Sequence, residues 1–188
     1  KTCSSLKNID CKNLVTVNGS AFYECKMLTT VNTPALVTVG GSAFYNCTSL
    51  NSINFGSSTT IGANAFQLCE SLEVIDAEAI TYINYYAFRG CVALKGENNI
   101  LNFSSLQKIE SNSSDSTPFG GSGIVNVKMP LVQEMGSHLF YGCSTLKSVS
   151  IGTLNNIPTN TFYGCTALAS VTLTGTQGIG TNAFYGCT

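Results

Sequence analysis

CSTLKSVSIGTLNNIPTNTFYGC, residues 143–165, holds one complete copy of a unit that recurs along the whole chain. The clearest marker of the unit is cysteine, which returns every 22 residues at Cys3, Cys25, Cys47, Cys69 and Cys91 and again at Cys143, Cys165 and Cys187. A leucine three residues after most of these cysteines, and a phenylalanine three residues before the next one, keep the same phase. Since several columns repeat together, the period indicates a stack of similar coils, each burying its apolar side chains against its neighbours.

The two halves of the unit predict different local structures. In the first half, Val149 and Ile151 alternate with serine, so both apolar side chains point to one face of a short β-strand. In the second half, small polar residues separate Ile157 from Phe162, a spacing that suits a single helical or 3-10 turn. Glycine often follows the apolar residue of the second half, and we expect it to permit a tight corner at Gly40, Gly62, Gly136 and Gly180.

The combined signature, Cys-x-x-Leu-x-x-Ile followed by Ile-Gly-x-x-Ala-Phe-x-x-Cys, resembles the BspA-like class of leucine-rich repeats. This class occurs in surface proteins of oral and gut bacteria and of some parasitic protists, and the resemblance covers almost the whole chain. It implies a leucine-rich repeat solenoid of the α/β class. In such a solenoid a curved parallel β-sheet takes one short strand from each 22-residue repeat, and short helical or 3-10 turns lie on the other side. The family often has proline directly after the strand, whereas here only Pro34 and Pro130 occupy that position.

We expect a single leucine-rich repeat domain over residues 1–188, with about eight repeats. The chain begins inside one repeat and stops inside another without a polar cap, so we interpret it as a fragment of a longer array. Between Cys91 and Cys143 the register slips, and insertions at 95–100 and 110–120 make the repeats irregular. The second insertion is hydrophilic and predicts a solvated loop, although insertions in repeat arrays often lie on a binding face.

The composition argues against nucleic acids and lipids as partners. Only 10% of the residues are charged and the net charge is -1, so the chain lacks the basic clusters that bind phosphate backbones or anionic membranes. No apolar run approaches the roughly 18 residues of a membrane-spanning helix, and we expect no membrane insertion in this segment. The surface must be built mainly from Ser, Thr, Asn and Gly.

The sequence contains no constellation that predicts catalysis or a cofactor. His138 is the single histidine, no Gly-x-Ser-x-Gly elbow or phosphate-binding loop is present, and we expect a protein that is not an enzyme. The cysteines lack the Cys-x-x-Cys pairs of zinc sites, and we expect no metal. We favour small buried hydrophobic side chains over disulfides between stacked coils, and interpret Cys11, in the Ile151 column, as a core residue.

Two surfaces are candidates for binding. The strand residues that face away from the core form an open, polar sheet face, weakly charged and poor in aromatic residues. They are Asn8, Asp10, Thr30, Asn32, Ser52, Asn54, Val74, Asp76, Asn126, Lys128, Ser148, Ser150, Ser170 and Thr172. The second candidate is an aromatic column at the outer edge, made by Tyr23, Tyr45, Tyr141, Tyr163 and Tyr185, each of which follows the closing phenylalanine of its repeat.

The family resemblance implies a non-catalytic module of a cell-surface or secreted protein that binds a protein or a glycan. Adhesion to host extracellular proteins is the known theme of the class. Two alternatives remain open at this stage: a structural spacer that presents another domain, and an intracellular scaffold, which free thiols would suit.

Overall fold

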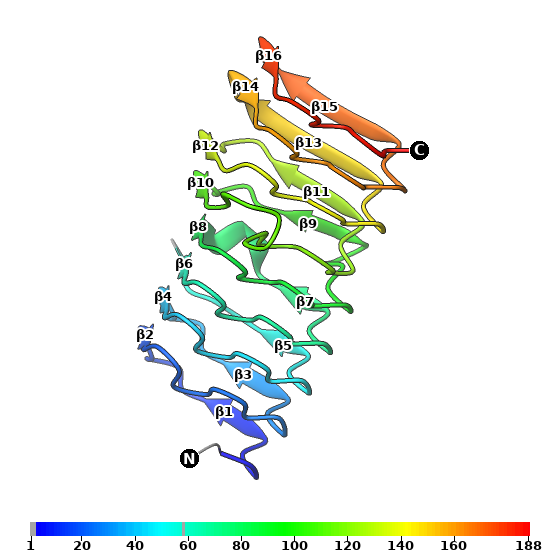
Figure 1. Cartoon of the computed structure of the whole chain (residues 1–188). Helices are drawn as coiled ribbons and strands as arrows, with labels where there is room; N and C mark the ends of the chain where they lie inside the picture. The colour runs from blue at the N-terminus through cyan, green and yellow to red at the C-terminus, as the bar shows by residue number, and fades with distance from the viewer. Residues whose placement is uncertain (1–2, 58) are drawn as a thin grey trace.

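The computed structural model describes residues 3–57 and 59–188, which form a stack of coils with two short strands in each turn (Figure 1). The first strands of successive coils are β1 (Asn8–Asp10), β3 (Thr30–Asn32), β5 (Ser52–Ile53), β7 (Val74–Ile75), β9 (Ile100–Asn102), β11 (Asn126–Met129), β13 (Ser148–Thr153) and β15 (Ser170–Thr174). The second strands are β2 (Thr16–Val17), β4 (Thr38–Val39), β6 (Thr59–Ile61), β8 (Ile80–Ile83), β10 (Lys108–Ile109), β12 (Glu134–Met135), β14 (Asn156–Ile157) and β16 (Gly178–Ile179).

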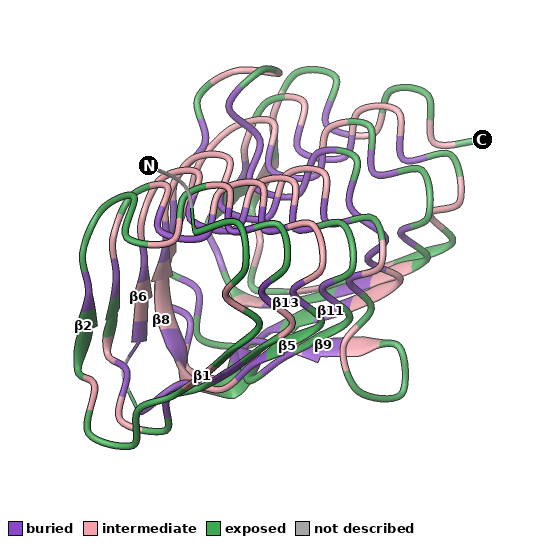
Figure 2. Ribbon diagram, turned by 90° about the horizontal axis from the view of Figure 1, so that it is seen from below, coloured by how far each residue is buried: buried purple, intermediate pink, exposed green. Residues whose placement is uncertain are grey.

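The strands pair in parallel with their equivalents in neighbouring coils. The first strands form the sheets β1-β3-β5-β7 and β9-β11-β13-β15, and the second strands form β2-β4-β6-β8-β10-β12 and the pair β14-β16. Val31 pairs with Ile53 in register, which confirms that one 22-residue unit makes one coil. Seen almost along the stack, the first strands line one side, the second strands line another, and the turns close the third (Figure 2). The predicted parallel solenoid is therefore present.

The second half of each unit differs from the predicted helical turn. It contains a two- to four-residue strand, and among the described residues η1 (Ala77–Ala79) is the single 3-10 helix. The reason is the stacking itself: an extended segment can donate hydrogen bonds to the preceding coil, as the Gly40 N–H does to the Val17 carbonyl at 2.7 Å. A helical turn would keep these hydrogen bonds within one coil.

The corner glycines serve a different purpose from the one predicted. None of Gly40, Gly62, Gly136 and Gly180 has a positive φ. A Cβ on Gly62 would come within 2.7 Å of the Gly41 nitrogen, so this column is glycine because adjacent backbones nearly touch. Left-handed φ values instead occur two residues before and after the closing phenylalanine, for example at Ser20 and Glu24, where the chain makes successive tight turns.

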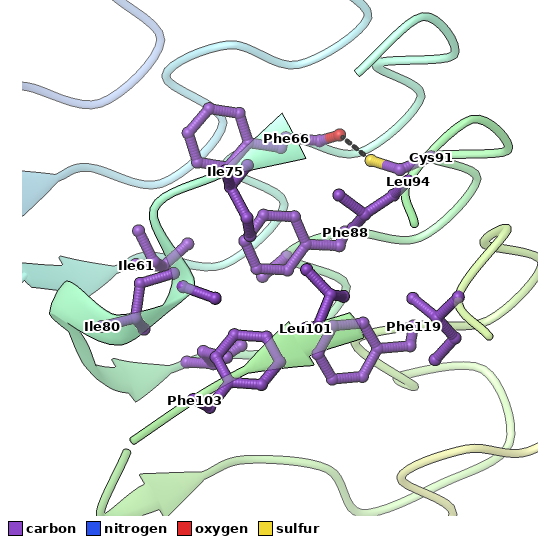
Figure 3. Close-up of a cluster of buried hydrophobic side chains, with 14 of the residues drawn as sticks. Ile61, Phe66, Ile75, Ile80, Phe88, Cys91, Leu94, Leu101, Phe103 and Phe119 are labelled. Atoms are coloured by element: carbon purple, nitrogen blue, oxygen red, sulfur yellow. Dashed lines mark hydrogen bonds between the residues drawn. The ribbon is translucent and has the colours of Figure 1, made fainter. Parts of the chain in front are cut away.

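A ladder of phenylalanine rings forms the centre of the core. Phe44 and Phe66 stack with centroids 5.2 Å apart, Phe66 and Phe88 follow at 5.4 Å, and all three side chains are fully buried. In Figure 3 the Cys91 thiol reaches the Phe66 carbonyl, to which it donates at 3.1 Å. The remaining ring-to-ring contacts of this ladder run from Phe22 to Phe184 with the same stacked geometry.

The cysteines inside the array follow the favoured interpretation, but those in the end coils do not, since Cys3 is exposed and Cys187 is half-buried. All nine are free thiols, and the six in the interior of the array, Cys25, Cys47, Cys69, Cys91, Cys143 and Cys165, are buried. Cys11 was predicted to lie in the core, but it is exposed. It follows directly on β1 in the first coil, so a neighbouring coil covers it from one side only. Within residues 3–57 and 59–188, no helix is long and apolar enough to cross a bilayer.

Candidate functional site

Strict alternation along the first strands separates a buried face from an open one. In β3, Val31 is buried while Thr30 and Asn32 on either side of it are exposed. The same pattern holds in the other first strands, and every residue predicted for the open face is exposed or half-buried. The predicted positions therefore lie on one side of the array, where a partner could contact them without disturbing the core.

Amide and hydroxyl side chains on this face are tied together between coils. The Asn54 amide donates to the Asn32 side-chain oxygen at 3.0 Å, and the Asn32 amide donates to the Asp10 carboxylate at 2.8 Å. Beside this row, the Thr30 hydroxyl donates to the Asn8 side-chain oxygen at 2.7 Å. The Thr33 N–H donates to the Asn54 side-chain oxygen, and this hydrogen bond fixes the Asn54 side chain at the end of the row. These bonds fix the rotamers, so less conformational entropy is lost when a partner binds.

The face is divided where the register slips. β7 ends one sheet and β9 begins the next, and the chain between them makes the tight turn Glu97–Ile100. Asn98 and Asn99 have φ values of 52° and 60°, the two left-handed positions of a type I′ turn. The loop that contains this turn projects beyond the sheet beside β9 (Figure 2). Across the break, the Asn102 amide donates to the Glu78 carboxylate at 2.7 Å.

This projection turns part of the flat face into a groove with a volume of about 660 Å³. The floor comes from β3, β5 and β7, and the far wall from η1, the turn and β9. The groove is lined by Thr30, Val31, Asn32, Ser52, Ile53, Asn54, Val74, Ile75, Asp76, Ala77, Glu78, Glu97, Ile100 and Asn102. All its charged lining residues are acidic, and all lie at the end of the groove formed by β7, η1 and the turn.

Sequence reasoning found the floor of the groove and missed its wall. Leu101 and Phe103 occupy the core columns, and this alternation was the available signal that Ile100 and Asn102 face outward. The sequence held no comparable signal for Glu78 or Glu97, because their positions depend on how the inserted residues fold. The predicted residues Asn126, Lys128, Ser148, Ser150, Ser170 and Thr172 lie beyond the break, on β11, β13 and β15, and the structure does not bring them into the groove.

The predicted tyrosine column is present as two separate stacks on the turn side. Tyr23 and Tyr45 stack at 4.8 Å, and Tyr141, Tyr163 and Tyr185 stack in a second run with the same 4.8 Å spacing. His138 lies beside the second run, and its Nε2 is 2.8 Å from the Asn160 amide nitrogen. No tyrosine of this column lines the groove on the sheet.

The chemistry of these surfaces is that of hydrogen bonding. Among residues 3–57 and 59–188, no three His, Cys, Asp or Glu side chains are grouped so that they could hold a metal ion. Burial raises the pKa of the Cys47 and Cys165 thiols to about 12 and that of Cys69 well above its usual value. These thiols are protonated at neutral pH and are therefore poor nucleophiles.

Known proteins with the same repeat resemble this chain over its whole length. The BspA type leucine rich repeat region matches residues 1–117 and 98–188, in six copies. The leucine-rich repeat protein of T. pallidum is 32% identical over 84% of this chain and 75% of that one, with a TM-score of 0.71. A leucine rich cell surface protein from Faecalibacterium prausnitzii is 20% identical over 94% of this chain and 66% of that one, with a TM-score of 0.53, which shows a shared fold. No curated protein matches the sequence.

Proposed function

The chain belongs to the BspA-type leucine-rich repeat family, and from that premise we propose that it binds a protein partner in the groove on its open sheet face. Leucine-rich repeat families are typically non-enzymatic binding modules. The observation that carries the proposal is the groove itself, a walled hollow on a polar face whose side chains are already held by hydrogen bonds. Such preorganised polar groups orient a partner at low entropic cost.

The shape of the groove favours an extended segment of the partner chain. Its floor spans three parallel strands, which lie roughly 4.8 Å apart in a sheet. An extended chain advances about 3.3 Å per residue, so roughly four residues reach across this floor. Asn32 and Asn54 offer amide groups to the backbone of such a segment, while Val74 and Ile100 offer small apolar contacts.

The charge of the groove favours a basic segment. Asp76, Glu78 and Glu97 line it, and none of its lining residues is basic. Exposed ion pairs contribute little free energy, so we expect the three carboxylates to act mainly on the association rate and on the salt dependence of binding. A lysine or arginine in the bound segment would then select one orientation along the stack.

We further propose that the module acts outside the cell, as part of a surface-exposed or secreted protein, and that its partner is a host extracellular protein. The resemblance to BspA-like surface proteins supports this location. The polar, nearly neutral face is compatible with a glycan as well, so glycans belong in the same binding screen. A structural spacer is the competing function, because the unbroken ladder of buried rings would make a stiff rod.

A biosensor screen against matrix proteins, plasma proteins and glycans at physiological salt tests the proposal. For a protein ligand, we expect saturable binding that Glu97→Lys weakens about fivefold, equivalent to roughly 1 kcal/mol. Lys128→Glu on the sheet beyond the break is the matched control and should leave the affinity unchanged. Binding that responds to Lys128→Glu and Ser150→Ala instead would place the partner on the other sheet. Binding to nothing in the screen would favour the spacer.

A further inference from the structure

The tyrosine column on the turn side is interrupted by an opening. The residue after each closing phenylalanine is tyrosine at Tyr45 and at Tyr141, but in the three coils between them this position holds Gln67, Arg89 and Gly120. Tyr163 covers one face of the Tyr141 ring at 4.8 Å. The His138 ring lies 5.7 Å from the same ring in a tilted arrangement, and the neighbouring coil has Gly120, without a ring, at the position equivalent to Tyr141. The second tyrosine stack therefore ends at Tyr141, which is half-buried.

A hollow of about 580 Å³ lies at this point, between Arg89 and Tyr141. Gly90 and Gly121 form part of its floor, while Asp115 and Thr117 of the inserted loop form a wall. The loop is internally braced, since the Ser116 hydroxyl accepts hydrogen bonds from the backbone N–H groups of residues 112 and 113. Arg89 is braced too, because it donates to the Asp115 carbonyl and its guanidinium lies 5.6 Å from the Tyr86 ring centroid.

The main-chain hydrogen bonds between coils are also interrupted at the hollow. In neighbouring coils, the N–H two residues after the phenylalanine donates to the next coil, as Gly90 does to the Gly120 carbonyl at 2.9 Å and Gly142 to the Tyr163 carbonyl at 2.8 Å. In the described part of the chain, the equivalent bond from Gly121 to the Tyr141 carbonyl is missing. A donor and an acceptor of the main chain are therefore left without each other beside the hollow.

The spacing of the core agrees with this opening. The Phe119 ring lies 5.8 Å from Phe88 and 5.7 Å from Phe140, against 5.2 Å between Phe44 and Phe66. A side chain at position 120 would require Thr117 to shift, because a Cβ on Gly120 would come within 2.6 Å of the Thr117 methyl group. The interruption of the tyrosine column is thus built into the inserted loop.

We propose that this hollow is a binding site for an aromatic side chain of a partner protein. A ring that continued the stack would lie one spacing, 4.8 Å, from Tyr141, which is within the range of favourable aromatic pairs. Arg89 on the other side supplies a planar cation within reach of the same ring. The site lies on the turn side, away from the sheet groove, so it is a second contact that does not depend on the first.

The absence of tryptophan from the chain makes the test direct. The probe is the capped peptide acetyl-Gly-Trp-Gly-amide, whose indole fluorescence is selectively excited and whose ring protons report binding by saturation-transfer NMR. We expect saturable binding that Tyr141→Leu weakens about two- to tenfold, the range of one aromatic pair. Arg89→Gln should weaken it about twofold. The matched control is Tyr185→Leu, which changes another ring of the same stack and should leave binding unchanged.

Several outcomes would overturn the proposal. They are no saturable binding, binding that Tyr141→Leu and Arg89→Gln leave intact, or a loss in Tyr185→Leu equal to that in Tyr141→Leu. Thermal melts by circular dichroism establish that each variant is folded, and Arg89→Gln still tests the site if Tyr141→Leu does not fold. Glu97→Lys in the sheet groove should not alter binding of the probe. This separates failure of the aromatic site from failure of the groove.

Discussion

Truncation of one ring in the phenylalanine ladder tests the account of the core. Phe162 is fully buried and stacks between Phe140 at 5.4 Å and Phe184 at 5.1 Å. Phe162→Ala removes the ring and leaves a cavity bounded by both neighbours. Deleting a buried phenylalanine costs about 3 to 5 kcal/mol through lost burial and the cavity together. Each coil of a repeat protein contacts only its neighbours, so we expect the loss at the two adjoining interfaces.

Phe184→Ala is the matched control. The ring of Phe184 is half-buried and stacks on one described neighbour, Phe162. Because the hydrophobic contribution scales with the apolar area removed from water, we expect Phe184→Ala to cost roughly half as much as Phe162→Ala. Because both variants replace phenylalanine with alanine, a difference between their unfolding free energies reports the effect of the position of the ring in the stack.

Urea denaturation followed by far-UV circular dichroism measures both costs. The free energy of unfolding in water should fall in the order wild type, Phe184→Ala, Phe162→Ala, provided that the slopes against urea are alike. A near-neutral Phe162→Ala, or a loss of stability no larger than that of Phe184→Ala, would contradict a core held together by the stacked phenylalanines. Either result would mean that the ladder does not carry the stability of the core.

Four further predictions concern the corners, the turns and the thiols. Gly62→Ala should destabilise by about 1 to 3 kcal/mol in urea melts, because its methyl group would press on the Gly41 nitrogen; a neutral result would contradict the close approach. Glu24→Gly should raise the thermal midpoint, since it relieves a left-handed φ that costs roughly 1 kcal/mol; a lower midpoint would argue against that turn. The exposed Cys11 should react quickly with a thiol reagent at pH 8, whereas the buried thiols should react only when the protein unfolds. Burial raises the pKa of the Cys47 thiol from its ordinary value of about 9 to about 12. The protonated thiol should therefore stabilise the fold fully below about pH 9, and this contribution should be lost as the pH approaches 12. A urea midpoint that stayed constant over that interval would contradict this expectation.

The candidate groove shows where sequence reasoning stops. Alternation placed Thr30, Asn32 and Asn54 on the open face, because a strand can bury only every second side chain. It did not predict that Glu78 and Glu97 would line the same groove at the end of that face. Their approach depends on the tight turn of the inserted residues and on the loss of pairing between β7 and β9, and neither follows from the 22-residue period.

The 22-residue period of the sequence is enough to predict a parallel stack of coils with a phenylalanine in each regular core layer. It also predicts a cysteine in every layer except the irregular one between Cys91 and Cys143. A strict period forces equivalent residues into register, so the core and the open face follow from the columns alone. The folded structure is needed to see that the second half of each coil is a strand, that the corner glycines allow adjacent backbones to approach closely, and that the insertions build a groove and a hollow. These features arise between coils, where hydrogen bonds and contacts join residues that no local pattern relates.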